Sequence, residues 1–102
     1  MFEVEGIEYE LKFNMNRIEL IEKALGTSVM AIATTQNAML SIGQIKTFLA
    51  YGTKESGDDK FLKAKPAMDM AEKLLEANGY TPVVNLILTQ LEEDCPFFFQ
   101  AG

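Results

Sequence analysis

The sequence predicts an α+β domain that is predominantly α-helical, with an N-terminal β-hairpin followed by four to five short helices. Two observations support this fold class. The alternation of apolar residues changes phase once, at Glu5-Gly6, and the residues that follow carry helix-capping signals with apolar side chains at three- and four-residue spacing. A chain of 102 residues supplies one hydrophobic core. We therefore predict a single domain over 1–102, made of a hairpin (1–13), a helical part (14–95) and an apolar tail (96–102).

The predicted hairpin rests on where its apolar residues fall. They occupy even positions before the turn and odd positions after it: Phe2, Val4, Ile7, Tyr9, Leu11 and Phe13. A two-residue turn at Glu5-Gly6 places them all on one face, with Val4 opposite Ile7. The other face carries Glu3, Glu5, Glu8, Glu10 and Lys12. Glu3 and Glu8 should oppose each other, which a basic partner or a divalent metal would relieve. Alternatively, this acidic face only prevents edge-to-edge pairing.

Three helices are predicted in the next segment. The first spans 16–25, from a capping-box-like Asn16 and Glu19 to Gly26. The second begins near Ser28 and has a weakly specified end. The third begins at a Ser-x-x-Gln capping box, Ser41 with Gln44, and ends at Gly52.

A polar stretch, TKESGDD at 53–59, is predicted to be a loop. A fourth helix begins near Pro66 and ends at Asn78-Gly79-Tyr80, a pattern typical of a Schellman end in which Tyr80 folds back on Leu75. A fifth helix then begins with Thr81 as its N-cap and Pro82 in its first turn.

Composition excludes several classes of function. The net charge of −6 argues against nucleic acid as a partner. With no histidine and one cysteine, Cys95, the chain lacks the residues for histidine acid–base chemistry and for the usual zinc sites. We predict no catalytic, cofactor-binding or metal-binding residues, and a protein that is not an enzyme. No apolar run approaches the roughly 18 residues of a membrane helix, and acids stand where a signal peptide is basic, so no membrane partner and an intracellular location are expected.

Two segments are candidate contact surfaces for a partner or for self-association. Residues 26–53 contain a single ionic residue, Lys46, and include Met30 and Met39. This segment is either exposed as a contact surface or wrapped by other helices. Three acids end the last helix, where the helix dipole favours cations: Glu92, Glu93 and Asp94. They mark either a contact or a solvated helix end.

The tail carries three consecutive phenylalanines, Phe97, Phe98 and Phe99. In an extended tail, Phe97 and Phe99 would pack inward and Phe98 would stay available to a partner. The tail either covers the hairpin or serves as a docking segment. Because phenylalanine is encoded only by UUU and UUC, these codons also form a U-rich stretch, and we predict that they mark a programmed frameshift site.

The N-terminal quarter of the chain resembles a known family. The resemblance lies in a spaced pattern followed by a helix ending in glycine: Gly6-x-x-Tyr9-x-Leu11-x-Phe13, then Ile18-x-x-Ile21-Glu22-x-x-Leu25-Gly26. This pattern is similar to that of the tail assembly chaperones of long-tailed bacteriophages, which also occur in gene transfer agents. The family has no fixed ligand residues to transfer.

The resemblance implies a chaperone of the tape measure protein. Homo-oligomers are expected separately, from the exposed strand edge of the hairpin and the nearly uncharged segment 26–53. The chaperone would act in the host cytoplasm and be absent from the mature virion. In many such phages a frameshifted longer form recruits tail tube subunits. The alternative is a small acidic regulatory or inhibitor module that binds a basic protein. Binding by such a module should weaken in salt, whereas capture through apolar surface should tolerate it.

Overall fold

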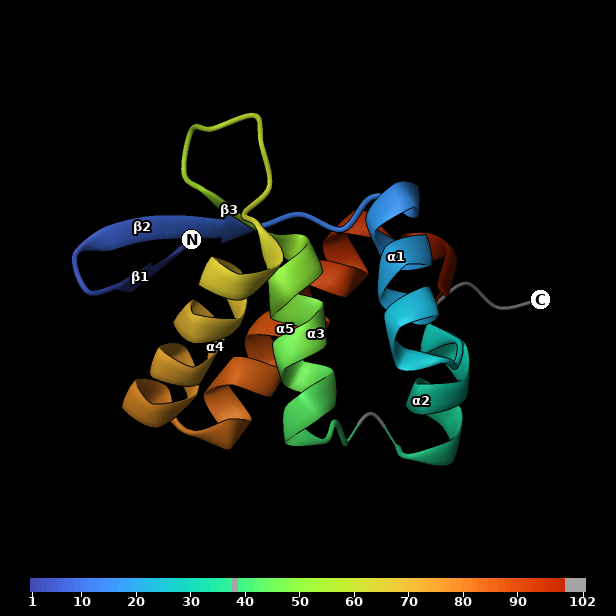
Figure 1. Cartoon of the computed structure of the whole chain (residues 1–102). Helices are drawn as coiled ribbons and strands as arrows, with labels where there is room; N and C mark the ends of the chain where they lie inside the picture. The colour runs from blue at the N-terminus through green and yellow to red at the C-terminus, as the bar shows by residue number, and fades with distance from the viewer. Residues whose placement is uncertain (38, 99–102) are drawn as a thin grey trace.

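The structure is a computed structural model that describes residues 1–37 and 39–98. Over these residues it contains five α-helices and one three-stranded antiparallel sheet, so the predicted α+β, mainly helical class is confirmed (Figure 1). The elements in chain order are β1 (Phe2–Val4), β2 (Ile7–Leu11), α1 (Met15–Leu25), α2 (Val29–Thr35), α3 (Ile42–Gly52), β3 (Thr53–Glu55), α4 (Ala64–Asn78), α5 (Tyr80–Asp94) and the short 3-10 helix η1 (Pro96–Phe98). None of the described helices has the length and apolar character needed to cross a membrane.

The hairpin has the predicted register. Val4 pairs with Ile7, Glu3 with Glu8 and Phe2 with Tyr9. The turn residues Glu5 and Gly6 have φ values of 50° and 82°, the positive values that a type I′ turn requires. Figure 1 shows this turn projecting past the helices, which explains why Ile7 is exposed although Tyr9 and Leu11 on the same strand are buried.

A third strand replaces the first part of the predicted loop at 53–59, so that prediction was wrong there. Strand β3 follows α3 directly and pairs with β2, placing Thr53 opposite Leu11. On its other side, the N–H of Leu62 donates to the carbonyl of Thr53, and Lys54 bridges to Phe61. Three residues with the sequence TKE carry no alternation of apolar and polar side chains, so only their position beside β2 reveals the strand.

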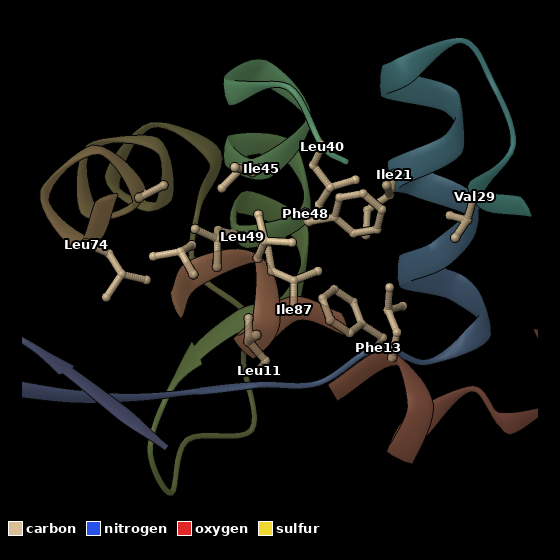
Figure 2. Close-up of a cluster of buried hydrophobic side chains, with 14 of the residues drawn as sticks. Leu11, Phe13, Ile21, Val29, Leu40, Ile45, Phe48, Leu49, Leu74 and Ile87 are labelled. Carbon is tan, nitrogen blue, oxygen red and sulfur yellow. The ribbon is translucent and has the colours of Figure 1, made fainter. Parts of the chain in front are cut away.

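Helix α3 lies in the middle of the molecule and packs against α1, α4 and α5. Its buried residues cover more than one side of the helix: Ile45, Thr47, Phe48, Leu49, Ala50 and Gly52. Figure 2 shows Phe48 and Leu49 meeting Ile87 of α5 in the core. The segment 26–53, with Lys46 as its single ionic residue, therefore divides into two parts. Helix α3 is the wrapped central helix, and α2 lies at the edge of the bundle (Figure 1).

The helix ends agree with the sequence at the two serines and at Gly26, Gly52 and Asn78, and they differ at the start of α1. Ser28 caps α2, and Ser41 forms the predicted capping box with Gln44. Helix α1 begins at Met15, and its N-cap lies two residues earlier than predicted, because the side chain of Asn14, not Asn16, accepts from the N–H of Arg17 at 2.9 Å.

The predicted corner between the fourth and fifth helices was wrong in detail. Gly79 has φ 86° and ψ 171°, which is not the left-handed conformation of a Schellman end. This one glycine makes the corner, so α5 already begins at Tyr80 and Thr81 is not its cap. The hydroxyl of Tyr80 donates to the carbonyl of Leu40 at 2.6 Å and ties α5 to the connection before α3.

Candidate protein-binding surfaces

An apolar pocket lies between α2, α3, α5 and η1. Its volume is about 50 Å³. The side chains around it are all apolar, and they include Val29, Met30, Ile32, Leu88, Leu91 and Phe98. Two residues predicted for the contact surface, Met30 and Phe98, are thus brought together. The spacing of Leu88 and Leu91 in the sequence indicates one face of the last helix, but it does not show that this face borders a pocket.

Helix α2 presents Met30 at this pocket because both ends of its first turn are anchored. The hydroxyl of Ser28 accepts from the N–H of Ala31 at 3.0 Å, and the carboxylate of Glu22 accepts from the N–H of Val29 at 2.8 Å. The side chain of Val29, the first residue of α2, is buried, while 40% of the next residue, Met30, is exposed. The helix, VMAIATT, carries no charged residue. Its outer surface is therefore apolar or weakly polar, without ions to hold water.

Met39 does not belong to this pocket, although it is 66% exposed. The following residue, Leu40, enters the pocket lining instead. The side-chain amides of Gln36 and Gln44 exchange two hydrogen bonds of 3.0 Å each and hold the ends of this connection together. The predicted surface thus has its two methionines at separate places.

Asp94 is not part of an exposed acidic surface, and its predicted place in one was wrong. Only 7% of its side chain is exposed. Its carboxylate accepts from the N–H of Phe13 at 2.8 Å, from Gln90 at 3.0 Å and from the ammonium of Lys12 at 3.3 Å. These donors offset the unfavourable helix dipole that the sequence alone suggests. Glu92 and Glu93 are exposed as predicted, and within residues 1–37 and 39–98 neither forms an ion pair.

The tail has the opposite arrangement from the one predicted. Pro96 begins a 3-10 turn rather than an extended segment, so Phe98 packs against the core while Phe97 is 45% exposed. The two rings contact each other with centroids 4.6 Å apart. The described part of the tail borders α2 and α5 and does not cover the hairpin. Phe99 and the rest of the predicted tail lie outside the described residues.

The acidic face of the hairpin is only partly neutralised. Glu10 pairs with Lys54 at 3.1 Å and Glu5 pairs with Lys73 at 2.7 Å, a hydrogen bond that raises the pKa of Lys73. Glu3 and Glu8 oppose each other, and neither has an ionic partner among the described residues. In the same part of the chain, no three His, Cys, Asp or Glu side chains gather where they could hold a metal ion.

Cys95 belongs to the core. It is fully buried, and its thiol donates to the carbonyl of Phe13 with 3.3 Å between Sγ and the oxygen. Burial raises the pKa of this thiol, and the neighbouring carboxylate of Asp94 raises it further. A protonated, enclosed thiol is a poor nucleophile.

No protein-family model, curated protein or solved structure matches the chain. The resemblance over residues 6–26 therefore stays a prediction from the sequence. The pocket, the exposed methionines and the acidic hairpin face are the features from which a function must be argued.

Proposed function

We propose that the protein is a non-enzymatic phage tail assembly chaperone that binds the tape measure protein in the host cytoplasm and is absent from the mature virion. The observation that carries the proposal is the apolar pocket beside the uncharged helix α2, with Met30 at its rim. The family resemblance supplies the identity of the partner. A longer frameshifted form that recruits tail tube subunits is part of the same proposal.

The surface suits the capture of an amphipathic helix. A chaperone of this kind needs exposed apolar area that no ion keeps hydrated, and methionine side chains adapt their shape to different partners. Helix α2 provides both, at the edge of the bundle where another helix has room to approach. The net charge of −6 keeps such a protein soluble while this area stays open.

Co-expression tests the proposal. A tape measure protein encoded in the same genome is produced with and without this chain, and its soluble yield is measured. We expect the yield to rise with the native chain and to fall back with Met30→Asp. The control is Met15→Asp, because Met15 is 60% exposed on α1 and does not line the pocket. Equal yields with both variants would contradict the proposed surface, and no rise with the native chain would contradict the proposed function.

Homo-oligomers are part of this proposal, and the exposed apolar residues Met30, Met39 and Phe97 support them. Sedimentation at micromolar to millimolar concentration measures the association. A strict monomer throughout that range would contradict it.

The frameshift is tested on the gene itself, which should contain a slippery heptamer at the codons of Phe97, Phe98 and Phe99 and an open alternative frame beyond the stop codon.

The acidic regulatory module stays as a second candidate, because Glu3 and Glu8 oppose each other without an ionic partner in the described residues. The two candidates respond differently to salt. Binding that depends on carboxylates should weaken strongly in about 0.5 M salt, where the screening length is only a few ångströms. Capture through the apolar pocket should be almost unchanged.

A further inference from the structure

Within residues 1–37 and 39–98, one edge of the sheet is open and the other is closed. Strand β1 forms the outer edge, because the strand order is β1-β2-β3. The opposite edge, on β3, is occupied by the bond from Leu62 and the bridge to Phe61. Strand β1 is short and carries one charge, Glu3, but its three residues, FEV, include no proline and no lysine, and the antiparallel register with β2 has no bulge.

The backbone of Glu3 points toward this open edge. The carbonyl of its partner Glu8 accepts from the N–H of Ser56 at 3.0 Å, on the β3 side, and so is turned away from β1. Opposed residues in an antiparallel pair alternate between bonded and non-bonded, and the flanking pair of the type I′ turn is the bonded one. The pair of Glu3 and Glu8 is therefore non-bonded. The N–H and C=O of Glu3 are left for a further strand.

A groove runs along the same edge. Two adjoining hollows, of about 390 Å³ and about 170 Å³, lie between β1 and the helices α4 and α5, and Glu3, Leu74 and Asn78 line both. The floor is largely apolar and includes Leu74, Val83 and Leu86. The rim carries three acids, Glu3, Glu5 and Glu76, and one cation, Lys73, which pairs with Glu5 at 2.7 Å. An added strand would lay one set of its side chains on this floor and the other set on the outer face, beside Glu3 and Glu8.

We infer that β1 is a docking edge for an extended segment of a partner protein, in which apolar residues alternate with lysine or arginine. The main chain of the segment extends the sheet by pairing with Glu3. Its apolar side chains fill the groove above Leu74 and Leu86, and its cations lie opposite Glu3, on the same face of the sheet as Glu8 of the next strand. Peptide recognition by strand addition takes its affinity from such main-chain bonds and its specificity from the alternating side chains.

Charge complementarity selects this occupant over a second copy of the chain. If two β1 strands paired about Glu3, the two Glu3 carboxylates would lie beside each other, with Glu8 of each copy next to them. Directly opposed like charges destabilise a sheet. A segment with cations at these positions removes that repulsion, and also relieves the one between Glu3 and Glu8 within the chain.

The test uses an acetylated and amidated peptide, KVKVKV, titrated into the isotope-labelled full chain while backbone amide shifts are recorded. We expect saturable binding with shifts confined to β1 and the groove. Glu3→Thr keeps the outward N–H and removes one charge, so it should weaken binding a few-fold. Glu3→Pro also removes the N–H, which β2 does not use, and should weaken binding about tenfold further. Circular dichroism establishes that both variants are folded.

The peptide itself supplies a second arm that does not depend on a variant fold. A peptide that is N-methylated at the backbone nitrogens facing β1 cannot pair with this strand and should not bind. A peptide that is N-methylated at the alternate nitrogens, which face away from β1, should bind like the parent. Equal binding by both peptides, equal binding by the two Glu3 variants, or shifts centred on Met30 would overturn the inference. So would a dimer that Glu3→Pro abolishes, because the edge would then pair with its own copy. Met30→Asp should leave peptide binding unchanged, which separates this inference from the proposed function.

Discussion

The backbone N–H of Phe13 donates to the carboxylate of Asp94 at 2.8 Å, across 81 positions of the sequence. The next residue, Cys95, completes the arrangement, because its thiol donates to the carbonyl of Phe13. Both backbone groups of a fully buried residue are therefore satisfied by two consecutive residues at the end of α5. This clamp joins the segment that leaves the sheet to the last helix of the domain.

The first prediction concerns this clamp. Asp94→Ala leaves the N–H of Phe13 without its acceptor, and an unsatisfied buried donor costs about 1–3 kcal/mol. We expect the free energy of unfolding, measured in urea, to fall by that amount. The control is Glu93→Ala, which removes an exposed acid from the same helix turn. Equal losses in the two variants would show that the clamp adds nothing to stability.

Replacing either of two glycines of α3 with alanine should change the free energy of unfolding, in opposite directions for the two positions. A methyl group on Gly52 would overlap the ring of Phe13, with 2.9 Å to Cζ and 3.0 Å to Cδ1, and this ring is fully buried. We expect Gly52→Ala to lower the free energy of unfolding by about 1–3 kcal/mol. Among the described residues, only Ser41 Oγ, at 4.0 Å, lies near the missing Cβ of Gly43 in the same helix.

Gly43→Ala should therefore raise stability by about 0.5–1 kcal/mol, because alanine loses less backbone entropy than glycine in a helix. Urea unfolding of both variants checks the pair. A Gly52→Ala domain as stable as the native one would mean that Phe13 has room to move.

The third prediction separates the two described phenylalanines of the tail. Phe98 packs against the core and Phe97 is 45% exposed. We expect Phe98→Ala to destabilise the domain by about 1–2 kcal/mol, which is a partial share of the loss for a fully buried phenylalanine. Phe97→Ala should change stability by less than about 0.5 kcal/mol. Thermal unfolding measures both, and a reversed order would place the other ring in the pocket.

The fourth prediction concerns Cys95, whose pKa burial raises. In the unfolded chain the thiol ionises near its usual pKa of about 8.5, whereas the folded thiol stays protonated at higher pH. The stabilisation that this difference in pKa provides is fully present below the unfolded pKa of about 8.5. It is lost as pH rises from there through the pKa of the folded thiol. Native stability should therefore fall more steeply than that of Cys95→Ala above about pH 8.5.

Labelling provides a direct measurement for the same thiol. At pH 8 an aromatic disulfide reagent should modify native Cys95 slowly, at a rate that follows unfolding, and should modify it rapidly in urea. Fast labelling of the folded protein would show that the thiol is accessible, contrary to its complete burial.

Local sequence signals could predict the hairpin and several helix starts. The phase change at Glu5-Gly6 determines the register, and Ser28 and Ser41 cap helices through hydrogen bonds within three residues. Strand β3 and the corner at Gly79 could not be predicted in this way. The strand depends on pairing with β2, and the corner depends on a backbone conformation that glycine permits but does not dictate.

The candidate surfaces were predictable only in part. Met30 was predicted for a contact surface because its segment lacks charge, and the structure exposes it at a pocket. The burial of Asp94 and the inward position of Phe98 depend on contacts with distant parts of the chain, which no local pattern encodes. The open edge of β1 follows from the order of the strands, so it became visible only once β3 was known.

The central position of α3 has a consequence for dividing the chain. Its neighbours come from both sides in sequence, α1 before it and α4 and α5 after it. A break at the exposed turn residue Gly57 would leave α3 on the first fragment without α4 and α5, which pack against it in the whole domain. Neither fragment could complete a core alone, but each carries the surface that the other lacks. The two pieces should reassociate into the native fold, which makes this domain a candidate for a split reporter whose signal appears only when both halves meet.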